Sequence, residues 1–267
     1  MPPLDPSPTA APDPGPLRRD LVAGLEKGLA VICAFDQEQE RPLLSVTELA
    51  QRCGLTRAAA RRYLITLQHL GFVRCERGRW ALTAKVLRLA QSYMHSGRLP
   101  RLVQPELHRL VATLKEASSA GVLEGDDVIC IAALSAGHLV SSTLQPGTRV
   151  PAYCTANGRV LLAALPEAQL EAWLSGRALP PLTPQTITDP ARLRTELARI
   201  RAQGYALVDQ ELETGLRTLS VPLVSADGAV LAAINVSAHA ARRSLESLLE
   251  HCLPALRQTQ ANLRRQL

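Results

Sequence analysis

The run from Ser45 to Leu82 constrains this chain most, because it has the pattern of two short helices followed by a hairpin. Ser45 is followed three residues later by Glu48, a capping-box pattern that predicts a helix starting after Ser45. Gly54 ends that helix, and Thr56 caps a second one that we expect to reach residue 70. Two helices joined by a short glycine-containing turn predict a helix-turn-helix, whose second helix enters the major groove of DNA.

The residues after this pair predict a wing. Phe72–Cys75 and Trp80–Leu82 are expected as strands, with Glu76–Arg79 as the tight turn between them. From residue 57 to residue 101 the chain has ten Lys or Arg and a single acid. A charge run can be only a solvated face, but this one coincides with a helix-turn-helix and a wing, which favours DNA binding. The residues expected to face bases or phosphates are Ser45, Thr56, Arg57, Ala58, Arg61, Arg62, Tyr63, Arg77 and Arg79.

The core of this predicted domain, residues 21–83, follows from apolar spacing. A preceding helix over 24–35 is expected to hold the other two helices. Its inward residues would be Leu25, Leu29, Ala30 and Ile32, and those of the second helix of the motif would be Ala60, Leu64, Leu67 and Leu70.

Composition bounds the rest of the chain. Its 267 residues allow about two domains. No stretch approaches the ~18 uninterrupted apolar residues of a membrane span, so we expect a cytoplasmic protein with no membrane partner. Residues 1–20 are proline-rich and are expected to be a disordered leader.

The net charge of +6 lies mostly in the N-terminal third. Six scattered cysteines without a CxxC predict reduced thiols and no zinc site.

The remaining chain predicts a linker and an α+β domain. Thr83 is expected to cap a long helix that runs to about Gly97 within a linker over 84–101, with Pro100 interrupting it and with exposed apolar positions that could form a dimer seam. Residues 102–267 would follow as the second domain. Its expected strands span 128–134, 139–144, 205–209, 218–224 and 229–237, and its expected helices span 103–117 and 156–165, begin at Asp189-Pro190, and run from 244 to the end. Strands mixed with helices, ending in an antiparallel meander, indicate an α+β sheet domain.

Two groups of residues in this domain could carry chemistry. Cys154 precedes a helix whose N-terminus could lower the pKa of its thiol, with His138 or His239 as a base, but a buried structural cysteine is the commoner case. Polar residues also interrupt two apolar strands: Thr218, Ser220, Asn235 and Ser237. With the helix N-terminus at Ala156, these groups could bind a small anion, or they could satisfy one another in the core. The spacing leaves both alternatives open.

Four segments give the chain a family resemblance. They are SVTELAQRCGLTRAAARRYLITLQHLGFV, RVPAYCTANGRVLLA, GYALVDQELETGLRTLSVPLV and GAVLAAINVSA. In this order and spacing the chain resembles the IclR family of bacterial transcriptional regulators, especially the branch that controls the protocatechuate and β-ketoadipate pathway. The resemblance implies a GAF-like effector domain, no enzymatic activity, no cofactor or metal, and dimers or tetramers on an operator. It places the effector against Val150, Ala156, Asn157, Asp209, Thr218, Asn235 and Ser237. Arg159 and Arg217 are natural partners for a carboxylate, but Arg217 could equally be structural.

The sequence therefore predicts a DNA-binding transcriptional regulator modulated by a small organic acid or aromatic effector, with operator DNA and RNA polymerase as further partners. Two alternatives stand beside it. One is a small-acid hydrolase that uses Cys154 and is fused to a DNA-binding anchor. The other is a purely structural DNA-binding dimer whose C-terminal core is filled.

Overall fold

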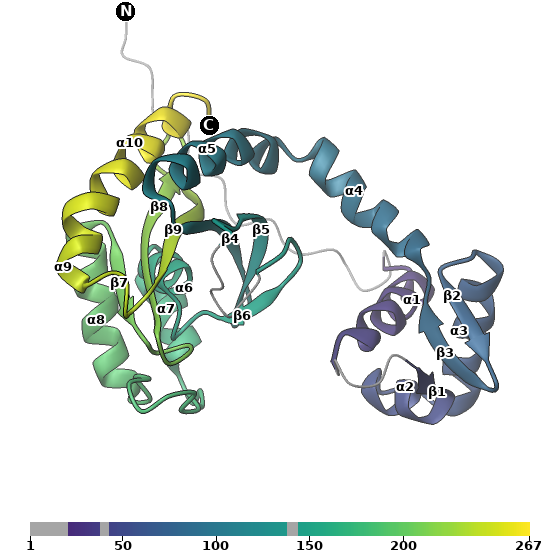
Figure 1. The fold of residues 1–267 in the computed structure, drawn as a ribbon. Helices are drawn as coiled ribbons and strands as arrows, with labels where there is room; N and C mark the ends of the chain where they lie inside the picture. The colour runs from purple at the N-terminus through teal and green to yellow at the C-terminus, as the bar shows by residue number, and fades with distance from the viewer. Residues whose placement is uncertain (1–20, 38–42, 138–143) are drawn as a thin grey trace, which may run out of the picture. The chain divides into compact units, whose positions relative to one another are not determined.

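Helices α1, α2 and α3 and a small antiparallel sheet form the N-terminal unit. The computed structural model describes residues 21–37, 43–137 and 144–267, and the chain divides into two units between Gln91 and Ser92 (Figure 1). The helical elements of the first unit are α1 (Ala23–Cys33), η2 (Ala34–Gln37), α2 (Val46–Arg52), α3 (Arg57–His69) and η3 (Ala84–Val86). Its strands, in spatial order, are β1 (Leu44–Ser45), β3 (Arg79–Leu82) and β2 (Val73–Glu76).

Local hydrogen bonds explain why the motif forms where the sequence predicts it. The Ser45 hydroxyl accepts a bond from the backbone N–H of Glu48 at 3.2 Å, and the Glu48 carboxylate accepts one from the backbone N–H of Ser45 at 2.7 Å. Thr56 caps α3 by accepting from the backbone N–H of Ala59. The wing turns on two residues with positive φ, Arg77 at 49° and Gly78 at 77°, as a two-residue hairpin requires. The predicted helix-turn-helix and wing are confirmed.

The predicted inner face of α1 is wrong at three of its four residues: Leu25, Leu29 and Ala30 are exposed, whereas Ile32 packs against the core as predicted. Leu25 and Leu29 are 63% and 48% exposed, whereas Val31, which the prediction omitted, is fully buried against α2, α3 and the wing. Only the C-terminal part of α1 reaches this core, so the apolar residues of its first turns stay at the surface. At the end of α3, Leu70 is also 47% exposed, because it is the residue on which the helix stops.

The helix after the wing ends near Gly97, as predicted, but Pro100 is not the residue that interrupts it. Thr83 caps η3, as expected, and α4 follows over Leu87–Ser96. The break is at Gly97, which is the N-cap of α5 (Arg98–Leu114), and Pro100 lies in the first turn of α5. Proline fits there because the first N–H groups of a helix have no partner within it. The division of the chain at 84–101 into a linker thus remains a prediction.

The C-terminal unit is built on one antiparallel sheet. Its strands, in spatial order, are β6 (Arg149–Pro151), β5 (Asp127–Leu134), β4 (Ala117–Glu124), β9 (Val230–His239), β8 (Leu216–Val224) and β7 (Ala206–Asp209). The predicted α+β class is confirmed. The sequence missed β4, whose small residues do not alternate with apolar ones, although it lies between β5 and β9. The strand predicted over 139–144 falls, except for Leu144, outside the described residues.

Helices cover both faces of this sheet (Figure 1). The remaining helices are α6 (Ala156–Ala163), α7 (Glu167–Leu174), α8 (Pro190–Gln203), α9 (Leu245–Ser247), the π-helical turn η4 (Leu248–Cys252) and α10 (Leu253–Arg264). One core lies between the sheet and α5 and α10, and the other between the sheet and α6, α7 and α8. Asp189 caps α8 as expected, accepting from the backbone N–H groups of Ala191 and Arg192.

Candidate functional site

A cavity of about 240 Å³ lies in the C-terminal unit where the N-terminus of α6 meets the sheet. The strands place polar side chains there by simple alternation. In β8 Leu219 and Val221 belong to the core under α10, so Thr218 and Ser220 point to the opposite face, toward α6. The described residues that line the cavity are Ala117, Ser118, Ser119, Ala133, Leu134, Ser135, Leu144, Gln145, Val150, Thr155, Ala156, Asn157, Val208, Leu212, Leu216, Thr218, Asn235 and Ser237.

The polar wall of the cavity is held by hydrogen bonds across the sheet. The side-chain oxygen of Asn235 accepts from the backbone N–H of Ser119 at 2.9 Å and from its hydroxyl at 2.8 Å. The hydroxyl of Ser118 donates to the backbone oxygen of Asn235 at 2.5 Å. Thr155 caps α6 by accepting from the backbone N–H of Gly158 at 3.3 Å. The polar residues therefore partly satisfy one another, but they also leave an open cavity, which contradicts the alternative of a filled core.

None of the described residues that line the cavity is charged. Its polar groups are hydroxyls, two asparagine amides, one glutamine and the first backbone N–H groups of α6. A helix N-terminus carries a partial positive charge and unpaired donors, so it favours a carboxylate. The remaining surface comes from aliphatic side chains, which suit an apolar ring or chain.

Six of the seven effector positions expected from the sequence line this cavity: Val150, Ala156, Asn157, Thr218, Asn235 and Ser237. The seventh does not. The Asp209 carboxylate accepts from the guanidinium of Arg217 at 2.7 Å, and Arg217 also donates to the backbone oxygens of Ala240 and Arg243. Asp209 and Arg217 thus join β7, β8 and the segment after β9. Ser118, Ser119 and Thr155 also line the cavity but were not expected from the sequence. Ser118 and Ser119 lie in β4, a strand that the sequence did not predict.

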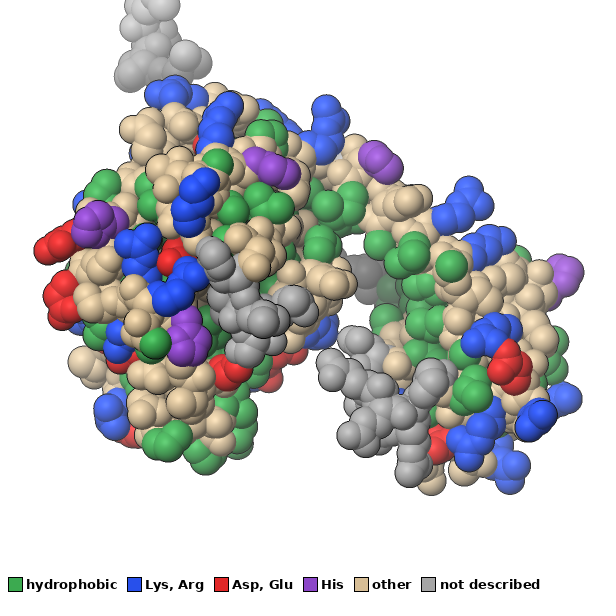
Figure 2. Space-filling view, in the orientation of Figure 1, with side chains coloured by type: hydrophobic (Ala, Val, Ile, Leu, Met, Phe, Trp, Pro, Cys, Tyr) green, Lys and Arg blue, Asp and Glu red, His purple; other side chains and the backbone are tan. Residues whose placement is uncertain are grey.

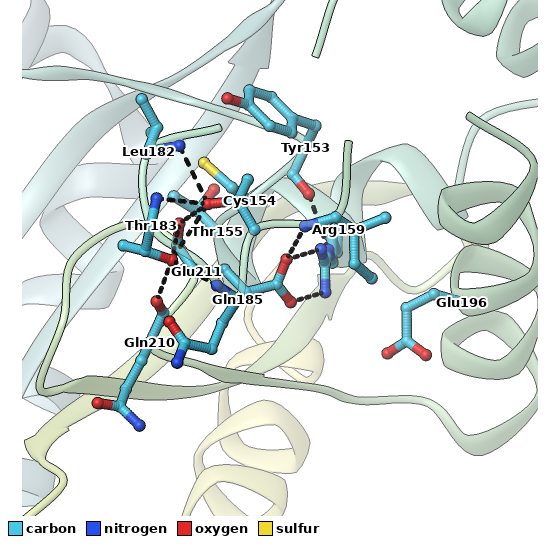
Figure 3. A network of polar contacts seen from close by, with 12 residues as sticks. Tyr153, Cys154, Thr155, Arg159, Leu182, Thr183, Gln185, Glu196, Gln210 and Glu211 are labelled. Atoms are coloured by element: carbon cyan, nitrogen blue, oxygen red, sulfur yellow. Dashed lines mark hydrogen bonds and ion pairs between the residues drawn. The ribbon is translucent and has the colours of Figure 1, made fainter. Parts of the chain in front are cut away.

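Arg159 is not available as a carboxylate partner for a ligand. Its side chain is 1% exposed and forms a two-pronged ion pair with Glu211, with both N–O distances at 2.6 Å (Figure 3). Its Nε also donates to the backbone oxygen of Tyr153 at 2.8 Å. Glu211 in turn accepts from the backbone N–H of Ile187. This pair ties α6 to the loop between β7 and β8, whose Leu212 lines the cavity.

Cys154 does not have the properties of a nucleophile. It is fully buried, and burial raises the pKa of its thiol to about 12, opposite to the lowering that the helix N-terminus suggested. Of the two histidines considered as its base, His138 lies outside the described residues. The ring of His239 accepts from the backbone N–H of Ala241 at the protein surface. The described residues also contain no group of three or more His, Cys, Asp or Glu side chains that could hold a metal ion.

The N-terminal unit exposes the basic side chains that the sequence assigned to DNA. Arg57, Arg61 and Arg62 are exposed on α3, beside the exposed Ala58, and Arg77 is exposed at the tip of the wing. Figure 2 shows more basic than acidic side chains on the face of this unit that it presents. A basic recognition helix beside a basic wing is the arrangement by which a winged helix-turn-helix contacts the groove and the backbone of DNA.

The other expected DNA contacts have structural partners as well. Ser45 and Thr56 cap α2 and α3, and Tyr63 packs partly against the core of the unit. The guanidinium of Arg79 donates to the backbone oxygen of Leu43 at 3.2 Å and lies 3.9 Å from the carboxylate of Glu48. These residues can position the motif whether or not they touch DNA.

The two units match two family models. Residues 24–77 match the IclR helix-turn-helix domain, and residues 91–265 match the bacterial transcriptional regulator IclR C-terminal domain. Within the described ranges no helix is long and apolar enough to cross a membrane.

Known relatives extend over most of the chain. The Pca regulon regulatory protein of Pseudomonas putida is 41% identical over 249 residues, 93% of this chain and 85% of that protein. The p-hydroxybenzoate hydroxylase transcriptional activator of Acinetobacter baylyi is 38% identical, with 92% of each chain covered. The crystal structure of an IclR homologue from Microbacterium hydrocarbonoxydans in complex with 4-hydroxybenzoate is 26% identical and has a TM-score of 0.74, covering 91% of this chain and 98% of that one. These relatives and both family models are of transcriptional regulators, which argues against the hydrolase alternative.

Proposed function

The chain belongs to the IclR family of transcriptional regulators, and we propose that it controls genes of aromatic catabolism by binding operator DNA in response to a small aromatic monocarboxylate. The observation that carries this proposal is the uncharged cavity at the N-terminus of α6. The related regulators support it, since one is named for p-hydroxybenzoate hydroxylase and the structure of another contains 4-hydroxybenzoate.

The chemistry of the cavity favours one carboxylate over two. Burying a carboxylate costs free energy unless hydrogen-bond donors of the protein replace the water molecules that it loses. The first N–H groups of α6 can supply these donors for one carboxylate. No described lining residue offers a cation for a second carboxylate. A volume of about 240 Å³ suits a single ring. Ring hydroxyls would then meet the neutral Ser, Thr and Asn side chains, which can both donate and accept.

We expect 4-hydroxybenzoate or protocatechuate to stabilise the C-terminal unit against heat, because a ligand that binds only the native state adds about 2.7 kcal/mol at 100 times its Kd. Thermal unfolding of the purified protein checks this against β-ketoadipate, cis,cis-muconate, glyoxylate and pyruvate. A rise with β-ketoadipate or muconate alone would contradict the monocarboxylate assignment, and no rise with any of the six would contradict the aromatic-acid class.

DNA binding by the proposed regulator requires two copies for a palindromic operator, because each copy presents one recognition helix. We place the dimer contact on the exposed apolar side chains of α4, namely Leu87, Leu89 and Tyr93. We further propose that two dimers bind one operator, that RNA polymerase is a partner and that the protein is cytoplasmic.

Arg61→Ala is expected to weaken operator binding by about 1–3 kcal/mol if Arg61 reads a base, and to lower the salt dependence of binding if it contacts a phosphate. Fluorescence anisotropy with operator DNA at several salt concentrations measures both. The matched control is Arg264→Ala, which removes an exposed arginine from α10. Equal affinity and salt slope for the Arg61 variant and the wild-type protein would remove Arg61 from the interface.

The proposed coupling between ligand and operator has a reciprocal consequence. If the aromatic acid changes the operator affinity by some factor, the operator must change the affinity for the acid by the same factor. Titration of the acid with and without operator DNA tests this.

A further inference from the structure

We propose that Ser220 is a positioning residue that sets ligand specificity by determining whether the nitrogen or the oxygen of the Asn157 amide faces the cavity. Asn157 lines the cavity as the second residue of α6, whereas Ser220 is fully buried behind it in β8. The Ser220 hydroxyl donates to the side-chain oxygen of Asn157 at 2.7 Å. This inference rests on the proposed function, because it concerns how the cavity selects an acid.

The hydrogen bond from Ser220 leaves the amide nitrogen of Asn157 for the ligand. Among the described residues, no buried side-chain nitrogen or oxygen lacks a hydrogen-bond partner. No described residue accepts a hydrogen bond from the nitrogen of this amide, so this nitrogen is not fully buried, and we place it at the cavity that Asn157 lines. It thus presents a donor beside the first backbone N–H groups of α6, and all of these donors suit a carboxylate.

The hydroxyl of Ser220 has a second acceptor within reach, so the orientation of the Asn157 amide can reverse. Its oxygen lies 3.0 Å from the backbone oxygen of Ile234. A hydroxyl has one proton, so Ser220 can donate either to Asn157 or to Ile234. When it donates to Ile234, it can accept from the Asn157 nitrogen instead, and the amide then turns its oxygen toward the ligand.

The other asparagine of the cavity has no such freedom. The side-chain oxygen of Asn235 accepts from the backbone N–H of Ser119, which can only donate. The nitrogen of Asn235 is therefore fixed on the opposite side, toward Ser237. Of these two amides, only that of Asn157 is oriented by a group that can either donate or accept. Whether Asn157 offers the ligand a donor or an acceptor at the N-terminus of α6 therefore depends on Ser220.

The test compares 4-hydroxybenzoate with its neutral analogue 4-hydroxybenzamide by isothermal titration calorimetry on the full chain. The wild-type protein should prefer the acid. Ser220→Ala removes the donor that holds the Asn157 oxygen away from the ligand, so the ratio of acid to amide affinity should fall about tenfold, the usual size for one hydrogen bond to a charged group. A purely structural effect would weaken both compounds equally and leave this ratio unchanged.

Two further variants sharpen the test. Asn157→Asp keeps the shape of the side chain but offers the ligand only acceptors, so it should lose the acid and retain the amide. Ser225→Ala removes another buried hydroxyl, in the turn between β8 and β9, and should keep the wild-type ratio. If the wild-type protein binds the acid and Ser220→Ala keeps its preference, the role of Ser220 is refuted while the proposed function stands. If the wild-type protein binds neither compound, both fail.

Discussion

Glu211→Gln is expected to lower the free energy of unfolding of the C-terminal unit by about 3–5 kcal/mol, because it leaves the buried guanidinium of Arg159 without a counter-ion. The glutamine can still accept from the backbone N–H of Ile187, so the lost charge is the main change. Ligand affinity should fall as well, since the neighbouring Leu212 lines the cavity. Differential scanning calorimetry with and without 4-hydroxybenzoate measures both effects. The unfolding transition that the ligand shifts is that of the C-terminal unit.

Two variants separate the buried charge from a general effect of the loop. Glu213→Gln makes the same change two residues away, where no ion pair forms within the described residues, and should cost less than about 0.5 kcal/mol. Arg159→Met combined with Glu211→Gln removes both charges and should recover most of the stability, because replacing a whole buried pair is often nearly neutral. If Glu211→Gln were as stable as Glu213→Gln, the pair would not stabilise the native state.

The sequence predicts the N-terminal unit well because its signals are local. The capping box of Ser45 and Glu48, the Thr56 cap and the turn at Arg77-Gly78 each depend on residues within four positions of one another. The same reasoning fails for α1, where the buried residue is Val31 and not Leu25. The inner face of a short helix depends on where its neighbours pack, and apolar spacing alone does not contain that information.

The candidate site is predictable only where alternation or a cap places a side chain. Alternation along β8 and β9 correctly groups Thr218, Asn235 and Ser237. It does not show that Arg159 is paired with a residue 52 positions away, since that contact exists only after the sheet and α6 assemble. An arginine beside a helix N-terminus therefore looks like a ligand-binding group in the sequence, although its charge is already neutralised in the fold.

The close approach of α6 to the segment before it depends on Gly158. A Cβ atom built on Gly158 would lie 2.2 Å from the backbone oxygen of Ala152 and 2.3 Å from its Cα. Backbone atoms cannot rotate away as the end of a side chain can, so α6 or the segment around Ala152 would have to move. Both border the cavity, through Ala156 and Asn157 on one side and Val150 on the other.

Gly158→Ala is therefore expected to destabilise the C-terminal unit by about 3 kcal/mol or more and to abolish binding of the aromatic acid, while operator binding by the folded N-terminal unit is retained. Calorimetry and anisotropy measure the two properties separately. Gly28→Ala is the matched control, because Gly28 also lies in a helix, α1, and its added Cβ would meet nothing closer than 4.0 Å. It should instead stabilise by about 0.5–1 kcal/mol, since alanine is the better helix former. Equal stability of the two variants would show that the contact between Gly158 and Ala152 relaxes without cost, and that the cavity does not need this approach.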